Sequence, residues 1–77
     1  MTATYHITTT SGRVQEWIFT EYTDTNDYGN GTYISVVRDN ECIAYADMRY
    51  TRYVFDSFCM SYLRQWFGDN LLKAERV

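Results

Sequence analysis

A stripe of apolar side chains at helical spacing is the feature that most constrains the fold of this chain. The polar residues between them, such as Ser57, Arg64 and Gln65, face the other way, so the pattern predicts an amphipathic helix over about 52–67. Gly68 follows the stripe directly and is a natural helix stop. A helix with one broad apolar face needs a second layer to cover it. The stripe consists of Phe55, Phe58, Cys59, Tyr62, Leu63, Trp66 and Phe67.

The residues before this helix are typical of β-strands. Residues 4–23 are rich in β-branched and aromatic side chains on both sides of Ser11-Gly12, a turn signal, and predict a first hairpin. A two-residue loop would place Ile7 opposite Glu16, whereas a three-residue loop ending at Gly12 gathers the large apolar residues on one face. We therefore expect the three-residue loop and a common face bearing Tyr5, Ile7, Trp17 and Phe19.

A second hairpin is predicted over residues 32–50, after an acidic Gly/Asn loop at 24–31 that carries many turn residues. Asp39-Asn40 suits the two positive-φ positions of a tight turn. That turn would pair Val36 with Ile43 and Ile34 with Tyr45, which would add these four side chains to the core face.

Strands followed by one helix predict an α+β fold in a single domain, because 77 residues are too few for two. We expect a four-stranded antiparallel sheet of two β-hairpins with the helix packed on one face. The C-terminal segment 69–77 is either a short strand or a helical turn, and we favour the strand. With no second helix in the sequence, the other face of the sheet would meet water or a partner.

Charge is distributed unevenly along the chain. The net charge is −3, with a single Lys among its seven basic residues. The segment from Glu16 to Asp47 contains seven acidic residues and a single basic one, Arg38, which gives it a net charge of −6. Residues 48–77 carry a net charge of +2. The acidic balance argues against nucleic acid as the main partner and favours a protein partner with a basic surface.

The residues that could carry chemistry are few, so we expect no enzyme, no cofactor and no metal. His6 is the only histidine, and the sequence predicts no enclosed site in which it could activate Cys42 as a nucleophile. Three Cys and His residues in total are too few for a structural zinc site. Residues 24–35 match the calcium-loop pattern at its first positions and then depart from it, and no phosphate-binding glycine loop is present.

Compartment and membrane association follow from the same inspection. The N-terminus carries neither a basic stretch nor an apolar segment of the secretory type, which predicts a cytoplasmic protein. Cys42 and Cys59 are accordingly expected to be free thiols. No apolar run approaches the length needed to span a bilayer, so no membrane partner is expected.

Protein recognition is the function that the composition favours. Tyr, Trp and Arg are enriched at interfaces while Lys is depleted, and the chain has eight Tyr, two Trp and one Lys. We expect a small acidic interaction module, one version of which is an inhibitor that occludes a nucleic-acid-binding site. Small acidic proteins of phages and mobile elements act in this way, some anti-CRISPR proteins among them, although no motif here carries such a resemblance. The candidate partner-binding residues are Glu21, Tyr22, Asp24, Asp27, Tyr28 and Tyr33.

Two alternatives remain open. Arginines beside aromatic residues are what single-strand nucleic-acid binding uses, and this combination occurs at Arg49, Tyr50, Arg52 and Tyr53. The uncovered sheet face could instead join two copies of the chain in a homodimer, a structural module with no other ligand.

Overall fold

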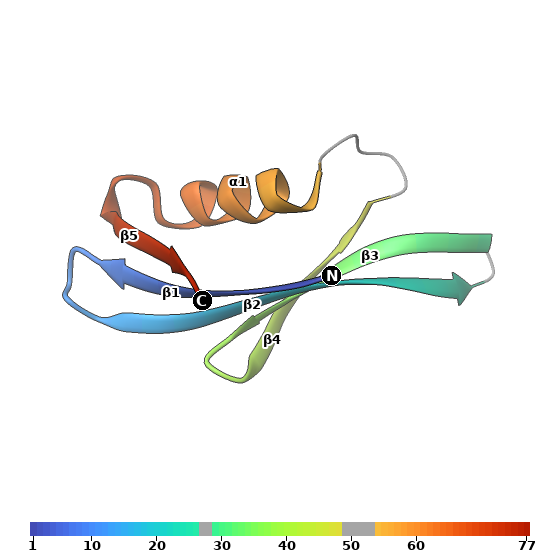
Figure 1. Cartoon of the computed structure of the whole chain (residues 1–77), viewed down its shortest axis with the longest axis horizontal. Coiled ribbons are helices and arrows are strands. Elements are labelled where there is room, and N and C mark those ends of the chain that lie inside the picture. The colour runs from blue at the N-terminus through green and yellow to red at the C-terminus, as the bar shows by residue number, and fades with distance from the viewer. Residues whose placement is uncertain (27–28, 49–53) are drawn as a thin grey trace.

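A computed structural model describes residues 1–26, 29–48 and 54–77. It confirms the α+β fold, with an antiparallel sheet and one helix packed on one face (Figure 1). The sheet has five strands rather than four, because the C-terminal segment forms a strand. Their order is β4-β3-β2-β1-β5, so the chain makes a four-stranded meander, crosses the sheet with the helix and returns beside β1. The elements are β1 (Thr2–Thr9), β2 (Val14–Asn26), β3 (Gly29–Arg38), β4 (Glu41–Asp47), α1 (Phe55–Phe67) and β5 (Leu71–Arg76).

The first hairpin has the predicted loop and register. Gly12 has φ 81°, and its N–H donates to the Thr9 carbonyl over 2.9 Å. This left-handed conformation is the one that glycine adopts without a steric cost. Tyr5 stands opposite Trp17, so the large apolar residues of β1 and β2 share the face under α1, as expected.

The second hairpin begins as predicted and then departs from the predicted register. Asp39 and Asn40 have φ 48° and 68°, the two positive-φ positions of a tight turn. A bulge between Val36 and Val37 then shifts the pairing by one residue. Val36 faces Ala44 and Ile34 faces Ala46, so the predicted pairs with Ile43 and Tyr45 are wrong. An extra residue reverses the side of every side chain that follows it.

The bulge divides the predicted β4 residues between the two faces. Ile43 and Ala44 both pack against the core, since a bulge allows two successive residues to approach the same side. Tyr45, predicted in the core, is 69% exposed on the opposite face.

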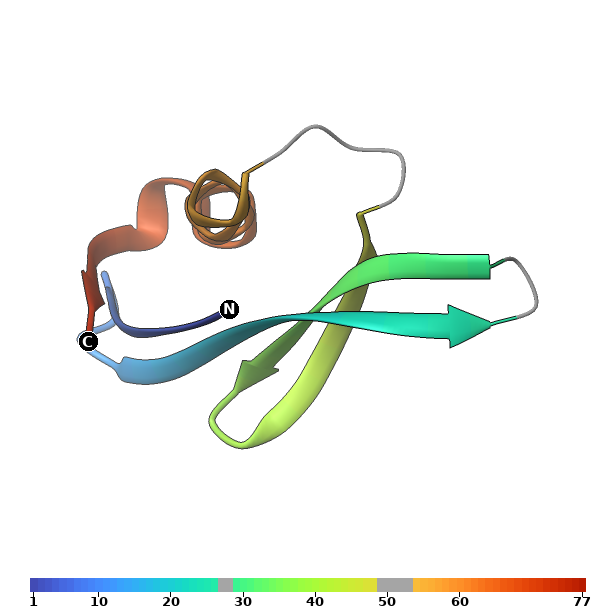
Figure 2. The ribbon, with the colours of Figure 1, turned by 45° about the vertical axis from the view of Figure 1, so that its right-hand side comes forward.

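The acidic loop expected at 24–31 is instead strand along most of its length. β2 continues to Asn26 and β3 starts at Gly29, and Asp24 is paired with Gly31. The turn residues were misleading because strand pairing outweighs their low strand propensity at this position. Figure 2 shows that this end of β2 and β3 projects beyond the helix.

The core lies between α1 and the strands β1, β2 and β3. Trp17 is fully buried and contacts four aromatic rings at centroid distances of 5.5–6.2 Å, one in its own strand and three in the helix. Its partners are Phe19, Tyr62, Trp66 and Phe67. The predicted stripe of the helix therefore faces the sheet, with Phe55, Cys59 and Leu63 buried at its centre.

The ends of the helix are set by backbone geometry. The helix starts at Phe55, three residues later than expected, after Val54 in extended conformation, and no side chain of a described residue caps it. Gly68 has φ 57° and ends the helix, as predicted. β5 then pairs with β1, and its Arg76 donates to the Asp56 carboxylate over 2.8 Å, which links the last strand to the first turn of α1.

Candidate protein-interaction surface

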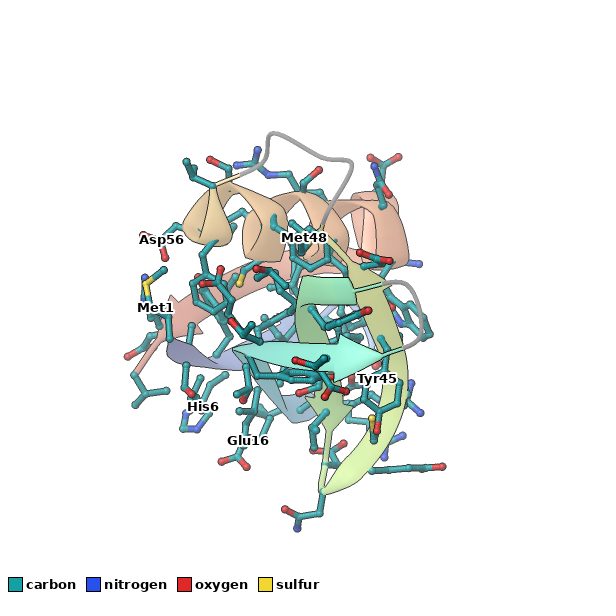
Figure 3. All side chains as sticks on the ribbon, turned by 90° about the vertical axis from the view of Figure 1, so that its right-hand side faces the viewer. Met1, His6, Glu16, Tyr45, Met48 and Asp56 are labelled. Carbon is teal, nitrogen blue, oxygen red and sulfur yellow. The ribbon has the colours of Figure 1, made fainter. Side chains whose placement is uncertain are left out.

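The face of the sheet turned away from α1 is where residues not needed by the core can act. Strand alternation places His6 and Glu16 on it, paired across β1 and β2. Figure 3 shows both side chains pointing away from the helix, whereas Met48 points toward it. In the part of the chain that the structure describes, no helix covers this face.

Tyr22 and Tyr33 form a ring pair on this uncovered face. They stand directly opposite each other in β2 and β3. Their ring centroids are 5.7 Å apart and the ring planes are inclined by 28°, a stacked arrangement. Directly opposed aromatic residues stabilise a strand pair by up to about 1 kcal/mol. Both side chains are partly exposed, so one side of the stack remains accessible.

Tyr45 extends this pair onto β4. It stands opposite Ser35, which puts it diagonally beside Tyr33 on the same face. Side-chain hydrogen bonding to Cys42 raises the pKa of the Tyr45 phenol, and the negative charge of the Tyr22 phenolate raises it further. The stack joins Tyr22 to Tyr33 and the strand register puts Tyr45 diagonally beside Tyr33, so the three phenol groups lie near one another across three strands.

Two carboxylates flank the tyrosines. Asp47 stands opposite Tyr33 at the end of β4, and Asp24 follows Tyr22 by two residues and so lies on the same face. Asp24 is exposed, and its Oδ1 accepts a hydrogen bond from the Thr25 N–H over 2.9 Å. We call the group formed by Tyr22, Tyr33, Tyr45, Asp24 and Asp47 the tyrosine surface.

The structure brings together only part of the predicted partner-binding set. Tyr22, Asp24 and Tyr33 belong to the tyrosine surface. Glu21 stands opposite the buried Ile34 and therefore lies on the side that faces α1. Asp27 and Tyr28 lie outside the described residues.

The residues of the nucleic-acid alternative, Arg49, Tyr50, Arg52 and Tyr53, also lie outside the described residues. An arginine–aromatic contact occurs elsewhere, where Arg38 stands over the ring of Trp66 at 5.7 Å from its centroid. Trp66 is half exposed there, so this contact covers an apolar ring.

Tyr45 and Asp47 are the residues that sequence reasoning missed. Tyr45 was assigned to the core by a register that left out the bulge, and Asp47 was counted only as part of the acidic stretch. The signal that points to their true position is the pair of small residues around Tyr45. Ala44 and Ala46 fit beneath a helix, where alternation then leaves Tyr45 on the outer face.

The groups able to do acid–base or nucleophilic chemistry are spread over the uncovered face. His6 Nε2 lies 3.8 Å from Glu16 Oε2, and Glu75 stands opposite His6 on its other side. Hydrogen bonding from Lys73 holds the pKa of Glu75 below its ordinary value. The exposed thiol of Cys42 belongs to β4, three strand spacings or about 14 Å from β1. Cys42 and His6 are therefore too far apart to act as a pair.

Metal and membrane sites were sought over the same residues. Among residues 1–26, 29–48 and 54–77, no three His, Cys, Asp or Glu side chains gather as metal ligands. No helix in this described part of the chain is both long and apolar enough to cross a membrane.

Among the described residues, an open hollow lies on the outer side of α1. It has a volume of about 510 Å³ and is open to solvent. Its lining is mixed in charge and contains neither a histidine nor a cysteine, and it consists of Asp56, Ser57, Met60, Ser61, Arg64 and Gln65.

Comparisons with known proteins leave the surface to be interpreted from its own chemistry. No protein-family model matches the chain, no curated protein matches its sequence, and no solved structure matches its fold.

Proposed function

We propose that this chain is a non-enzymatic interaction module that binds a protein with a basic surface through the tyrosine surface. The observation that carries the proposal is the stacked Tyr22–Tyr33 pair, with the 69% exposed Tyr45 beside it, on the face that α1 leaves uncovered. Cross-strand stacking explains why Tyr22 and Tyr33 are paired, but it does not require the third, exposed ring of Tyr45 beside them.

The chemistry of this surface fits arginine-containing partners. Each phenol ring offers a flat face over which a guanidinium group can stack, an interaction worth about 0.5–1 kcal/mol at an exposed site. The carboxylates of Asp24 and Asp47 stand at the two ends of the ring cluster, where they can accept charge-assisted hydrogen bonds. The chain's net charge of −3 adds long-range attraction that speeds encounter with a basic protein.

Such a module acts as an inhibitor when the basic surface that it covers is one that binds nucleic acid. Arginine and lysine side chains that stack on tyrosines and pair with carboxylates are withdrawn from phosphate contacts. Since phosphate contacts supply much of the affinity for nucleic acid, covering them is enough to block binding.

Charge reversal on this surface tests the function. The variant Asp24→Lys/Asp47→Lys should fail to capture the proteins that the native chain binds in a lysate of its source cells. The reason is that it places cations opposite the cations of the partner. The matched control is Glu21→Lys/Asp69→Lys, which changes the net charge equally at positions outside the tyrosine surface.

The captured proteins should be retained by this control. If both double variants lose them equally, net charge and not the surface governs binding, and the proposed site is wrong. A recovered partner should in turn lose its affinity for nucleic acid when the native chain is added, as a mobility-shift assay would show.

A further inference from the structure

The two edges of the sheet differ in how open they are to another strand. β5 carries Lys73, Glu75 and Arg76 near its end, with ion pairs from Lys73 to Glu75 at 3.0 Å and from Arg76 to Asp56 at 2.8 Å. Charged side chains of this kind discourage a second chain from pairing with an edge. β4, the opposite edge among the described strands, has only uncharged residues from Cys42 to Ala46 and contains no proline.

The backbone of β4 has groups turned outward for pairing. The Met48 N–H donates to the Thr32 carbonyl of β3 over 2.8 Å. Because alternate residues of an antiparallel strand bond to the same neighbour, Ala46 and Ala44 also bond toward β3, and the Tyr45 N–H points away from it. On the other side of the bulge, the tight turn makes Arg38 and Glu41 the bonded pair, so the Cys42 N–H also points outward.

This edge is continuous with the tyrosine surface, because Tyr45 belongs to both. Acidic residues stand at both ends of β4, with Glu41 at its start and Asp47 at its end. An added strand would therefore lie between two carboxylates, within reach of the exposed Tyr45 ring.

We propose that β4 accepts an extended, arginine-containing segment of the partner as a sixth strand of the sheet. This inference rests on the proposed function and specifies how the partner is held, with backbone hydrogen bonds along β4 and arginine side chains over the tyrosine surface. Main-chain pairing of this kind supplies affinity while alternate side chains supply specificity.

Charge disfavours a second copy of this chain as the occupant. When two β4 strands pair antiparallel through the outward groups of Cys42 and Tyr45, Glu41 of each copy lies within one residue of Asp47 of the other. This pairing brings like charges together at both of its ends, which destabilises it. A basic segment meets the same two positions with the complementary charge.

The experiment uses the whole chain and a synthetic peptide that alternates arginine with threonine. Cys42→Pro removes both the thiol and the outward N–H, whereas Cys42→Ala removes the thiol but keeps the N–H. The two variants therefore form a matched pair that differs at the backbone N–H. Cys42→Pro should bind the peptide about tenfold more weakly than Cys42→Ala, since one lost hydrogen bond and the ring's bulk both oppose the added strand. Thermal unfolding of the two variants shows whether both are folded.

Hydrogen exchange in the native chain gives a second measurement that needs no variant. On addition of the peptide, the Tyr45 and Cys42 amides should exchange at least tenfold more slowly, while outward amides of β5 should not change. Unchanged exchange at Tyr45 and Cys42 in a chain that binds the peptide would overturn the edge pairing.

Comparison of the variants separates this inference from the proposed function. Peptide binding that is lost in Asp24→Lys/Asp47→Lys but equal in Cys42→Pro and Cys42→Ala leaves the proposed function standing and overturns pairing at β4. No binding to the native chain overturns both. Protection of the Tyr45 amide that grows with protein concentration, without peptide, would place a second copy at this edge and would also overturn the inference.

Discussion

The thiol of Cys59 links the stability of this fold to alkaline pH. Cys59 is fully buried in α1 against the sheet. Burial, which disfavours the thiolate, is the main reason that its pKa rises from 9.0 to about 11, and the charge of Asp56 raises it further. In the unfolded chain the thiol regains its ordinary pKa, so the two states bind different numbers of protons between these pH values.

The sign of the effect follows from proton linkage. Below pH 9 both states hold the proton, and the stabilisation is fully present. Between pH 9 and 11 the unfolded state releases the proton and the folded state keeps it, so the free energy of unfolding falls as the pH rises. One pKa unit corresponds to about 1.4 kcal/mol, so the loss reaches roughly 1 kcal/mol at pH 10 and approaches about 3 kcal/mol above pH 11.

Urea unfolding of the native chain and of Cys59→Ala, at pH 8 and pH 10 in reducing buffer, measures this loss. Cys59→Ala is less stable at both values because it leaves a cavity, but its pH dependence should be shallower by about 1 kcal/mol. The difference also contains a part from Tyr5, because burial and then the neighbouring Cys59 raise the pKa of the Tyr5 phenol. Equal slopes for the native chain and Cys59→Ala would refute the linkage.

Two further predictions concern packing and backbone geometry. Trp17→Ala should lower the free energy of unfolding by about 3–5 kcal/mol, because it removes the ring that the helix packs on, while Trp66→Ala, at a half-exposed position, should cost clearly less. Urea titration of both checks the order, and a larger loss for Trp66 would show that the ring cluster is centred elsewhere. Gly12→Ala should destabilise by about 1 kcal/mol through its positive φ alone, since no atom lies within 4 Å of the added methyl group. Gly12→Asn should recover part of this loss, and a Gly12→Ala variant as stable as the native chain would contradict the turn geometry.

Features of the fold that depend on neighbouring residues could be predicted from the sequence. The helical stripe, the stop at Gly68, the loop ending at Gly12 and the turn at Asp39-Asn40 each follow from the residues present at that place. The faces of β1 and β2 followed as well, because loop length and hydrophobic alternation agree on a single register.

The candidate site was less predictable because it depends on one bulge and one strand extension. Nothing local to Ile43 requires an extra residue there. The bulge is favoured by the core, which gains both Ile43 and Ala44 under the helix. The extension of β2 and β3 through Asp24 and Gly31 likewise depends on the pairing of two strands and not on the propensity of either.

The location of the tyrosine surface follows from the unequal lengths of a helix and a strand with the same number of residues. α1 and β2 each contain 13 residues. At 1.5 Å per residue the helix is about 20 Å long, whereas at about 3.3 Å per residue the strand reaches roughly 43 Å. The molecule is 43 Å long, so one helix shields only about half of its length. The far ends of β2 and β3 therefore have no helix over them, and they must gain stability from cross-strand contacts such as the Tyr22–Tyr33 stack. The same rings that stabilise this arm are exposed to a partner, so replacing them would affect stability and binding together. Charge reversal at Asp24 and Asp47 is for this reason a cleaner test of recognition than removal of a tyrosine.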